Sequence, residues 1–168
     1  TMGDPRDFTN FMSAVIDAKA FANISGYIEH AREDPFCEII VGGGCDDSVG
    51  WFIEPTIIET TDPNAKSMVE EIFGPVAYCA PFSDEAEGVR LANNTDYGLA
   101  NSVWSSDLAR CHRVAEAFET GNGWINAHNV VVHGVPYAGV KKSGMGGGVV
   151  SLETLLDYYR NISVIRPL

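Results

Sequence analysis

Basic residues are scarce in this chain of 168 residues. Lys and Arg together number 11 against 23 Asp and Glu, which gives a formal net charge of −12 at pH 7. A surface of that charge repels the phosphate backbone of nucleic acids and the anionic headgroups of membranes. Long apolar runs are also lacking, because none approaches the length that crosses a bilayer. We therefore expect neither nucleic acid nor membrane as a partner, although solubility alone explains the acidity equally well.

Cysteine pairs of the kind that bind zinc are missing too. None of Cys37, Cys45, Cys79 and Cys111 lies in a C-x-x-C pair, so we predict no metal site. Cys79 lies in an apolar run and Cys111 in a helical pattern, and both are predicted to be small buried side chains. Free thiols indicate a reducing, cytoplasmic compartment. Disulfide pairing is the alternative, but no secretory signal favours it.

Helical and strand patterns alternate along most of the chain. Apolar residues at helical spacing predict a helix over residues 17–32, and Ser83 and Asp107 are predicted to cap two further helices. Runs rich in β-branched and aromatic residues predict strands at residues 38–41, 51–58, 76–82, 100–104 and 123–126. Pro55, inside the second of these runs, indicates an edge position or a break. This order predicts an α/β fold with a parallel sheet and flanking helices over residues 1–160. Residues 161–168 are predicted to form a terminal strand.

A carboxylate and an aromatic ring lie close together in the segment Glu70–Val76. The two oxygens of a carboxylate can accept hydrogen bonds from both hydroxyls of a ribose. Phe73, two residues after Glu71, could pack beside a flat nicotinamide ring. Taken alone, however, a Glu-Glu pair is typical of a solvated helix end, and a Phe before Gly-Pro is typical of a core. The rest of the sequence has to decide between these interpretations.

Several motifs in a fixed order provide that context. They are Glu70-Glu71-Ile72-Phe73-Gly74-Pro75-Val76, the turn at residues 93–100, Trp124-Ile125-Asn126 and Pro136-Tyr137-Ala138-Gly139. Together they resemble the carboxy-terminal part of the catalytic domain of NAD(P)-dependent aldehyde dehydrogenases, followed by the oligomerisation strand of that family. The resemblance implies NAD or NADP as the cofactor. By position it also implies that Glu71 binds the nicotinamide ribose and that Phe73 contacts the nicotinamide.

A segment without a regular period, residues 127–148, follows the Trp-Ile-Asn motif. In the family, positions in this loop line the passage for a small-molecule aldehyde. By position the resemblance implies four substrate-binding residues: His128, Asn129, Val131 and Tyr137. Such a passage needs apolar walls with one or two polar groups. His128 and His133 invite a general-base interpretation, but nothing nearby in the sequence orients either ring, and simple solvent exposure is the alternative.

The family's reaction needs parts that this chain does not contain. The resemblance implies oxidation of an aldehyde to a carboxylic acid through a thiohemiacetal on a cysteine. None of the four cysteines lies in the Gly-Gln-x-Cys setting of that nucleophile, so no catalytic residue is assigned here. Two hypotheses follow. The chain is part of a working aldehyde dehydrogenase, supplying cofactor contacts and a substrate wall, or it is a catalytically inert module for folding or oligomerisation.

Two further expectations concern the substrate and the partner. The first half, notably residues 11–17 and 44–50, is similar to pyrroline-5-carboxylate (glutamate-semialdehyde) dehydrogenases, which typically hold the substrate carboxylate with a Gly-Ser loop. Residues 129–135 contain no serine and three consecutive valines, so we expect an apolar or aromatic aldehyde instead. Residues 162–166 alternate as an edge strand would. The equivalent strand in the family pairs with a neighbouring subunit, which implies a homo-oligomer.

Overall fold

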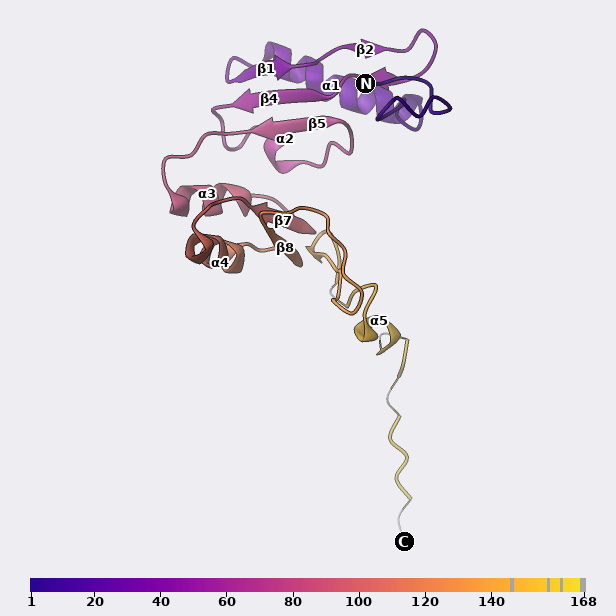
Figure 1. Cartoon of the computed structure of the whole chain (residues 1–168), viewed down its shortest axis with the longest axis vertical. Coiled ribbons are helices and arrows are strands. Elements are labelled where there is room, and N and C mark those ends of the chain that lie inside the picture. The colour runs from indigo at the N-terminus through magenta and orange to yellow at the C-terminus, as the bar shows by residue number, and fades with distance from the viewer. Residues whose placement is uncertain (146, 157, 161, 167–168) are drawn as a thin grey trace. The chain divides into compact units, whose positions relative to one another are not determined.

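The computed structural model describes residues 1–145, 147–156, 158–160 and 162–166. Internal contacts divide the chain into two compact units, Thr1–Ser83 and Asp84–Leu168, and each contains helices and strands (Figure 1). The predicted α/β class is therefore confirmed. Among the described residues, no helix combines the length and the apolar composition that spanning a membrane requires.

A three-stranded sheet lies at the centre of the first unit. Its order is β1 (Cys37–Val41), β4 (Thr56–Thr60) and β5 (Val76–Cys79), and β4 pairs antiparallel with β1 but parallel with β5. The sheet of this unit is thus mixed, and only its second pair has the predicted parallel direction. Two short strands, β2 (Cys45–Asp46) and β3 (Phe52–Ile53), pair antiparallel beside it. The predicted break at Pro55 is confirmed, because β3 and β4 are separate strands.

Helix α1 (Ala18–Glu33) supplies most of the core of the first unit. The helix begins where the Asp17 side chain accepts a hydrogen bond of 2.7 Å from the backbone N–H of Ala20, which satisfies a donor that the helix leaves unpaired. Its buried residues recur at the spacing of one helix face: Ile24, Tyr27, Ile28 and Ala31. Three of these form the hydrophobic core with Ile53 and Ile72.

The second unit is built around the parallel pair β7 (Ala100–Val103) and β8 (Asn122–Ile125). Helix α4 (Leu108–Ala117) connects the two strands, as the strand–helix–strand pattern predicted. The other elements are α3 (Glu85–Ala92), β6 (Tyr97–Gly98), β9 (Val140–Lys141) and α5 (Leu152–Leu156). β6 pairs antiparallel with β9, and this pairing anchors the end of the long loop that follows β8.

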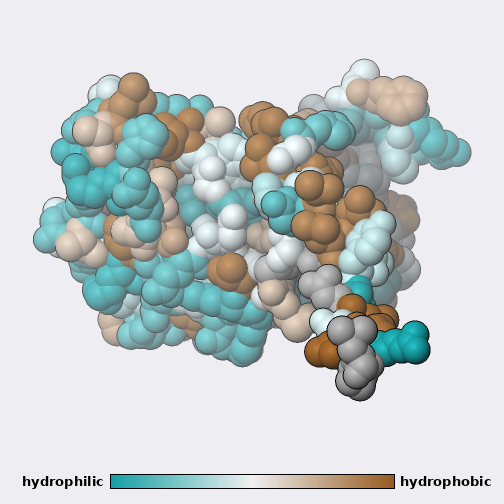
Figure 2. Space-filling view, turned by 90° about the horizontal axis from the view of Figure 1, so that it is seen from below, coloured by the Kyte–Doolittle hydropathy of each residue, from teal (hydrophilic) through white to brown (hydrophobic). Residues whose placement is uncertain are grey.

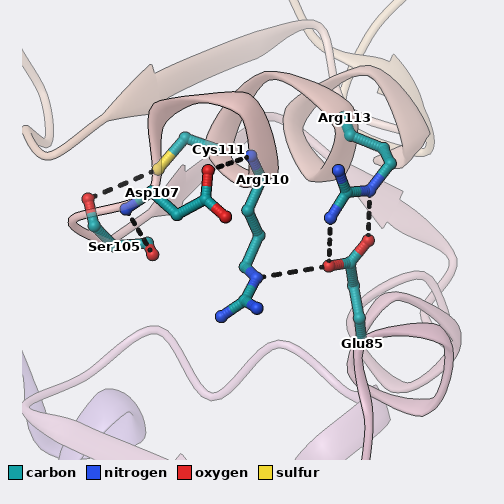
Figure 3. Close-up of polar contacts among 6 residues, drawn as sticks. All are labelled: Glu85, Ser105, Asp107, Arg110, Cys111 and Arg113. Atoms are coloured by element: carbon teal, nitrogen blue, oxygen red, sulfur yellow. Dashed lines mark hydrogen bonds and ion pairs between the residues drawn. The ribbon is translucent and has the colours of Figure 1, made fainter.

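Polar side chains join α3 to α4. The Glu85 carboxylate accepts two hydrogen bonds of 2.7 Å from the Arg113 guanidinium and lies 3.5 Å from Arg110 Nε (Figure 3). At the start of α4, Asp107 accepts a hydrogen bond of 3.0 Å from the backbone N–H of Arg110. The predicted cap at Asp107 is confirmed, and the bidentate pair links the two helices.

Two local predictions are wrong. The cap of α3 is Asp84 instead of Ser83, because the Asp84 carboxylate is the group that accepts from the backbone N–H of Glu87, at 2.8 Å. Cys79 is exposed, because β5 is an edge strand and its residues alternate between the core side and the outer side. Cys111, in contrast, is buried as predicted.

The predicted terminal strand begins at Asn161, which lies outside the described residues. Within the part of the chain that the structure describes, residues 162–166 are assigned to no strand. Their role in oligomerisation therefore stays a prediction.

Candidate functional site

The two glutamates after helix α2 (Lys66–Val69) have different environments. Glu70 Oε2 accepts a hydrogen bond of 2.6 Å from the Tyr27 hydroxyl and lies 3.8 Å from Lys66 Nζ. Glu71 is exposed, and within the described residues its carboxylate has no hydrogen bond or ion pair. Glu70 therefore serves the structure of the first unit, whereas both oxygens of Glu71 are available to an external donor.

Phe73 has an unusual backbone and an exposed side chain. Its φ angle is +56°, in the left-handed region that a bulky residue rarely adopts and that costs about 1–3 kcal/mol. The preceding residue, Ile72, is buried in the core, while the Phe73 ring is 86% exposed. A strained residue that places an apolar ring in solvent is a sign of function, since packing alone would favour the opposite.

Gly74 explains how the chain continues after this strained position. A Cβ atom at Gly74 would lie 2.5 Å from Ile24 Cδ1, so any larger residue would force the buried Ile24 side chain to shift. The carbonyl of Pro75 then accepts a hydrogen bond of 2.9 Å from the backbone N–H of Thr56. The Gly-Pro turn thus leads directly into β5.

The exposed pair fits the nicotinamide half of a dinucleotide. A partnerless carboxylate can accept from two vicinal hydroxyls, and a neighbouring exposed ring can pack against a planar heterocycle. Had Glu71 and Phe73 been buried, this interpretation would have been excluded. Their roles stay proposals, since fit alone does not assign a ligand.

A pocket of about 410 Å³ lies in the second unit, between β8 and the loop that follows it. Two of the four predicted substrate-binding residues, Val131 and Tyr137, line this pocket. None of its lining side chains carries a charge, and most are apolar: Gly121, Asn122, Gly123, Trp124, Ala127, Val130, Val131, Val132, Val135, Pro136 and Tyr137. Such a surface suits an uncharged, apolar ligand.

Trp124 holds the loop that forms the pocket. Its indole Nε1–H donates a hydrogen bond of 3.0 Å to the carbonyl of Val130. Its ring lies edge-on to His128, with centroids 5.3 Å apart, and is tilted toward Tyr137 at 6.4 Å. One side chain therefore contacts the loop at three points between residues 128 and 137. The sequence marked Trp124 only as part of a motif, and its role depends on contacts that local patterns do not contain.

Asn122, at the start of the same strand, also fixes the loop. Its Nδ2 atom donates hydrogen bonds of 2.8 Å to the carbonyls of Leu99 and Ala138. Sequence reasoning missed this residue as well, because its two acceptors lie 23 and 16 positions away. Together, Asn122 and Trp124 fix the position of the loop that lines the pocket.

The other two predicted substrate-binding residues lie beside the pocket and do not line it. His128 is exposed and packs on Trp124, while Asn129 is exposed with a φ of +55°. In the described part of the chain, no carboxylate is paired with the His128 or His133 ring, so the structure adds no support for a general base.

The cysteines do not look like nucleophiles. Burial is the largest cause that raises the pKa of the Cys37 thiol and of the Cys45 thiol above the ordinary value. A nucleophilic cysteine instead needs a lowered pKa, supplied by a nearby cation or helix N-terminus. Within the described residues, His, Cys, Asp and Glu form no group of three or more that could hold a metal ion.

Comparisons with known proteins agree with these observations. A model of the "Aldehyde dehydrogenase family" matches residues 1–165. The mitochondrial delta-1-pyrroline-5-carboxylate dehydrogenase of Danio rerio is 44% identical over 85% of this chain and 27% of its own length. The corresponding protein of Dictyostelium discoideum is also 44% identical, over 94% of this chain and 29% of its own length. The chain therefore spans less than a third of these relatives.

Solved structures show the same likeness. A betaine aldehyde dehydrogenase from Staphylococcus aureus in complex with NAD+ has a TM-score of 0.86 and 34% identity, covering 94% of this chain and 32% of that one. PnpE from Pseudomonas sp. WBC-3 has a TM-score of 0.87 and 35% identity, with the same coverage.

The comparisons also overturn one prediction. The pyrroline-5-carboxylate dehydrogenases named above are mitochondrial proteins, so the predicted cytoplasmic location is wrong. The error arose because free cysteines indicate a reducing environment but do not identify which reducing compartment a protein occupies.

Proposed function

Because this chain belongs to the aldehyde dehydrogenase family, we propose that it forms part of an NAD(P)-dependent enzyme that oxidises an aldehyde to a carboxylic acid. The observation that carries the proposal is the exposed Glu71 carboxylate without a partner, next to the exposed and strained Phe73. The nicotinamide coenzyme, when bound, supplies the hydride acceptor.

In this proposal the residues of the chain bind and orient, and they do not attack the aldehyde. Glu71 accepts hydrogen bonds from the nicotinamide ribose, and Phe73 packs beside the nicotinamide ring. Val131 and Tyr137 form the aldehyde wall, with His128 and Asn129 at its margin. The nucleophilic cysteine comes from outside these 168 residues, since none of Cys37, Cys45, Cys79 and Cys111 lies in the Gly-Gln-x-Cys setting of the family's nucleophile. Residues 162–166 provide a contact for self-association, and the compartment is mitochondrial.

Two substrate classes are candidates. The uncharged lining of the pocket favours an apolar or aromatic aldehyde. The 44% identity to pyrroline-5-carboxylate dehydrogenases favours glutamate semialdehyde. In the full-length enzyme that carries this segment, kcat/KM for benzaldehyde is expected to exceed kcat/KM for glutamate semialdehyde. A large preference for the semialdehyde would refute the expectation of an apolar or aromatic aldehyde.

The test of the cofactor role is Glu71→Gln in that full-length enzyme. Replacing a charged acceptor with a neutral one removes roughly 1.5–3 kcal/mol of hydrogen bonding, which corresponds to about a 10- to 100-fold rise in KM for NAD. Glu59→Gln is the matched control, because Glu59 is an exposed carboxylate on β4, outside the cofactor segment. An unchanged KM for NAD in Glu71→Gln would refute the proposal and favour the inert-module hypothesis.

A further inference from the structure

We propose that Tyr27 is a positioning residue for the cofactor segment, residues 70–74, and that it acts by fixing Glu70. This inference rests on the function proposed above, because it concerns how Glu71 and Phe73 are held in place. Tyr27 lies on α1, 43 positions before Glu70, and its hydroxyl donates the 2.6 Å hydrogen bond to Glu70 Oε2.

The backbone of the cofactor segment does not hold its own shape. Residues 71–73 belong to no helix or strand, and among the described residues their backbone N–H groups donate no hydrogen bond. Phe73 nevertheless keeps a φ of +56°, which an unrestrained Phe would leave for a lower-energy region. Anchors on either side of Phe73 must therefore impose this conformation.

Three anchors are present, and they all depend on the buried face of α1. Before Glu71, the Glu70 side chain is bonded to Tyr27. In the middle, Ile72 is buried in a core that contains Ile24 and Tyr27. After Phe73, Gly74 packs directly against Ile24. Ile24 and Tyr27 are three positions apart, so they lie on one face of the helix, and that face holds both ends of the segment.

Lys66 completes the anchor at the first end. Its ammonium lies 3.8 Å from Glu70 Oε2 and 5.2 Å from the centroid of the Tyr27 ring. The Glu70 carboxylate thus meets a hydroxyl and a cation, while the cation also rests on the aromatic ring. With Glu70 engaged in this way, Glu71 is the carboxylate of the pair that remains available to a ribose.

The decisive variant is Tyr27→Phe in the full-length enzyme. Loss of the hydroxyl releases Glu70 and loosens the segment, so KM for NAD is expected to rise about fivefold, less than in Glu71→Gln because Tyr27 acts only through Glu70. KM for benzaldehyde is expected to stay within about twofold, because the substrate pocket lies in the other unit. Tyr78→Phe is the matched control: Tyr78 packs against the same core, but its hydroxyl does not contact Glu70.

A second measurement does not depend on enzyme activity. In the 168-residue chain, the NMR chemical shifts of the backbone Cα and N–H of Ile72 and Phe73 report the φ angle of the strained position. They are expected to move toward the values of an ordinary extended residue in Tyr27→Phe and to stay unchanged in Tyr78→Phe. Unchanged shifts in both variants would overturn the inference.

The outcomes separate this inference from the proposed function. If Glu71→Gln leaves KM for NAD unchanged, the proposed cofactor role fails, and the positioning role with it. If Glu71→Gln raises KM for NAD but Tyr27→Phe does not, Glu71 binds the coenzyme and Tyr27 does not position it. If Tyr27→Phe raises the KM values for NAD and benzaldehyde equally, Tyr27 has only a general structural role, and the inference is wrong.

Discussion

The two units of this chain hold their candidate sites by different means. In the first unit the cofactor segment rests on a hydrophobic core in which Ile24, Ile28, Ile53 and Ile58 are almost completely buried. In the described part of the second unit, Cys111 is the one buried hydrophobic side chain. In this unit the loop that follows β8 is held instead by side-chain hydrogen bonds, from Trp124 and Asn122 among others.

The substrate pocket has an apolar surface. The pocket of the second unit is surrounded by apolar side chains that are more than half exposed: Val130, Val131, Val132 and Val135. Figure 2 shows hydrophobic side chains, in brown, at the surface among hydrophilic ones. Exposed valines in a loop contribute little to stability, so their presence is better explained by what they contact than by what they stabilise.

The difference matches what each site has to do. A backbone held in a strained conformation needs a rigid surrounding structure, because any loosening lets the strain relax. A substrate wall needs only a few fixed points, between which residues can differ without unfolding the domain. Under the proposed function, the first unit would recognise one coenzyme and the second would select among aldehydes.

The largest effect is expected from breaking the core of the first unit. Ile28 is fully buried, and Ile28→Ala should lower the free energy of unfolding of the chain by about 2–5 kcal/mol, through lost burial and the cavity left behind. Urea unfolding followed by circular dichroism measures the change. Ile16→Ala is the control, because Ile16 is 88% exposed and should change stability by less than about 0.5 kcal/mol. A loss below about 1 kcal/mol in Ile28→Ala would contradict the core assignment.

An intermediate loss of stability is expected from removing side-chain hydrogen bonds in the second unit. Asn122→Ala removes both hydrogen bonds of the Asn122 amide and leaves the carbonyls of Leu99 and Ala138 without this donor. The expected cost is about 1–2 kcal/mol, the usual effect of losing half-buried hydrogen bonds. Thermal unfolding measures it, with Asn129→Gly as the control, because it removes an exposed loop amide at a φ of +55° that glycine adopts without strain. If the two variants melt alike, the loop is not held by Asn122.

The smallest effect on stability is expected from lowering the pH. The hydrogen bond from Arg113 is the largest cause that lowers the pKa of the Glu85 carboxyl below its ordinary value. Because the pKa is lower in the folded chain than in the unfolded one, the Glu85–Arg113 pair stabilises the fold at neutral pH. This stabilisation decreases as the pH falls below the ordinary carboxyl range and through the lowered pKa.

Melting temperatures between pH 7 and pH 3 test this sign. In Glu85→Gln the melting temperature should fall less steeply on acidification than in the unchanged chain. Glu116→Gln, an exposed carboxylate on α4, should retain the full dependence. Because the pair is exposed to solvent, added salt should weaken the effect of Glu85. A parallel decline in all three proteins would show that Glu85 adds nothing.

Features that depend on neighbouring residues could be predicted from the sequence. Helix α1 was predicted within a residue at each end, because its apolar residues recur at helical spacing and Asp17 caps it. The break at Pro55 and the cap at Asp107 follow from the chemistry of single residues. The family resemblance, confirmed by the match over residues 1–165, depends only on the order of motifs along the chain.

Features that depend on distant contacts could not be predicted in this way. The sequence assigned Cys79 to the interior, because an apolar run does not say which strand lies at the edge of a sheet. It treated Asn129 like Val131, because position in a loop does not say which side chains line a pocket. Trp124 and Asn122 were not recognised as supports of that loop, since their partners are set by the fold.

The sequence by itself determined the elements, the family and the segments in which function should lie, because helical spacing, caps, turns and motifs are local properties of the chain. Only the tertiary structure decided that Glu70 is engaged and Glu71 free. That distinction requires the Tyr27 hydroxyl to arrive from a helix 43 positions away, and two adjacent, chemically identical residues can be told apart only by the neighbours that folding gives them.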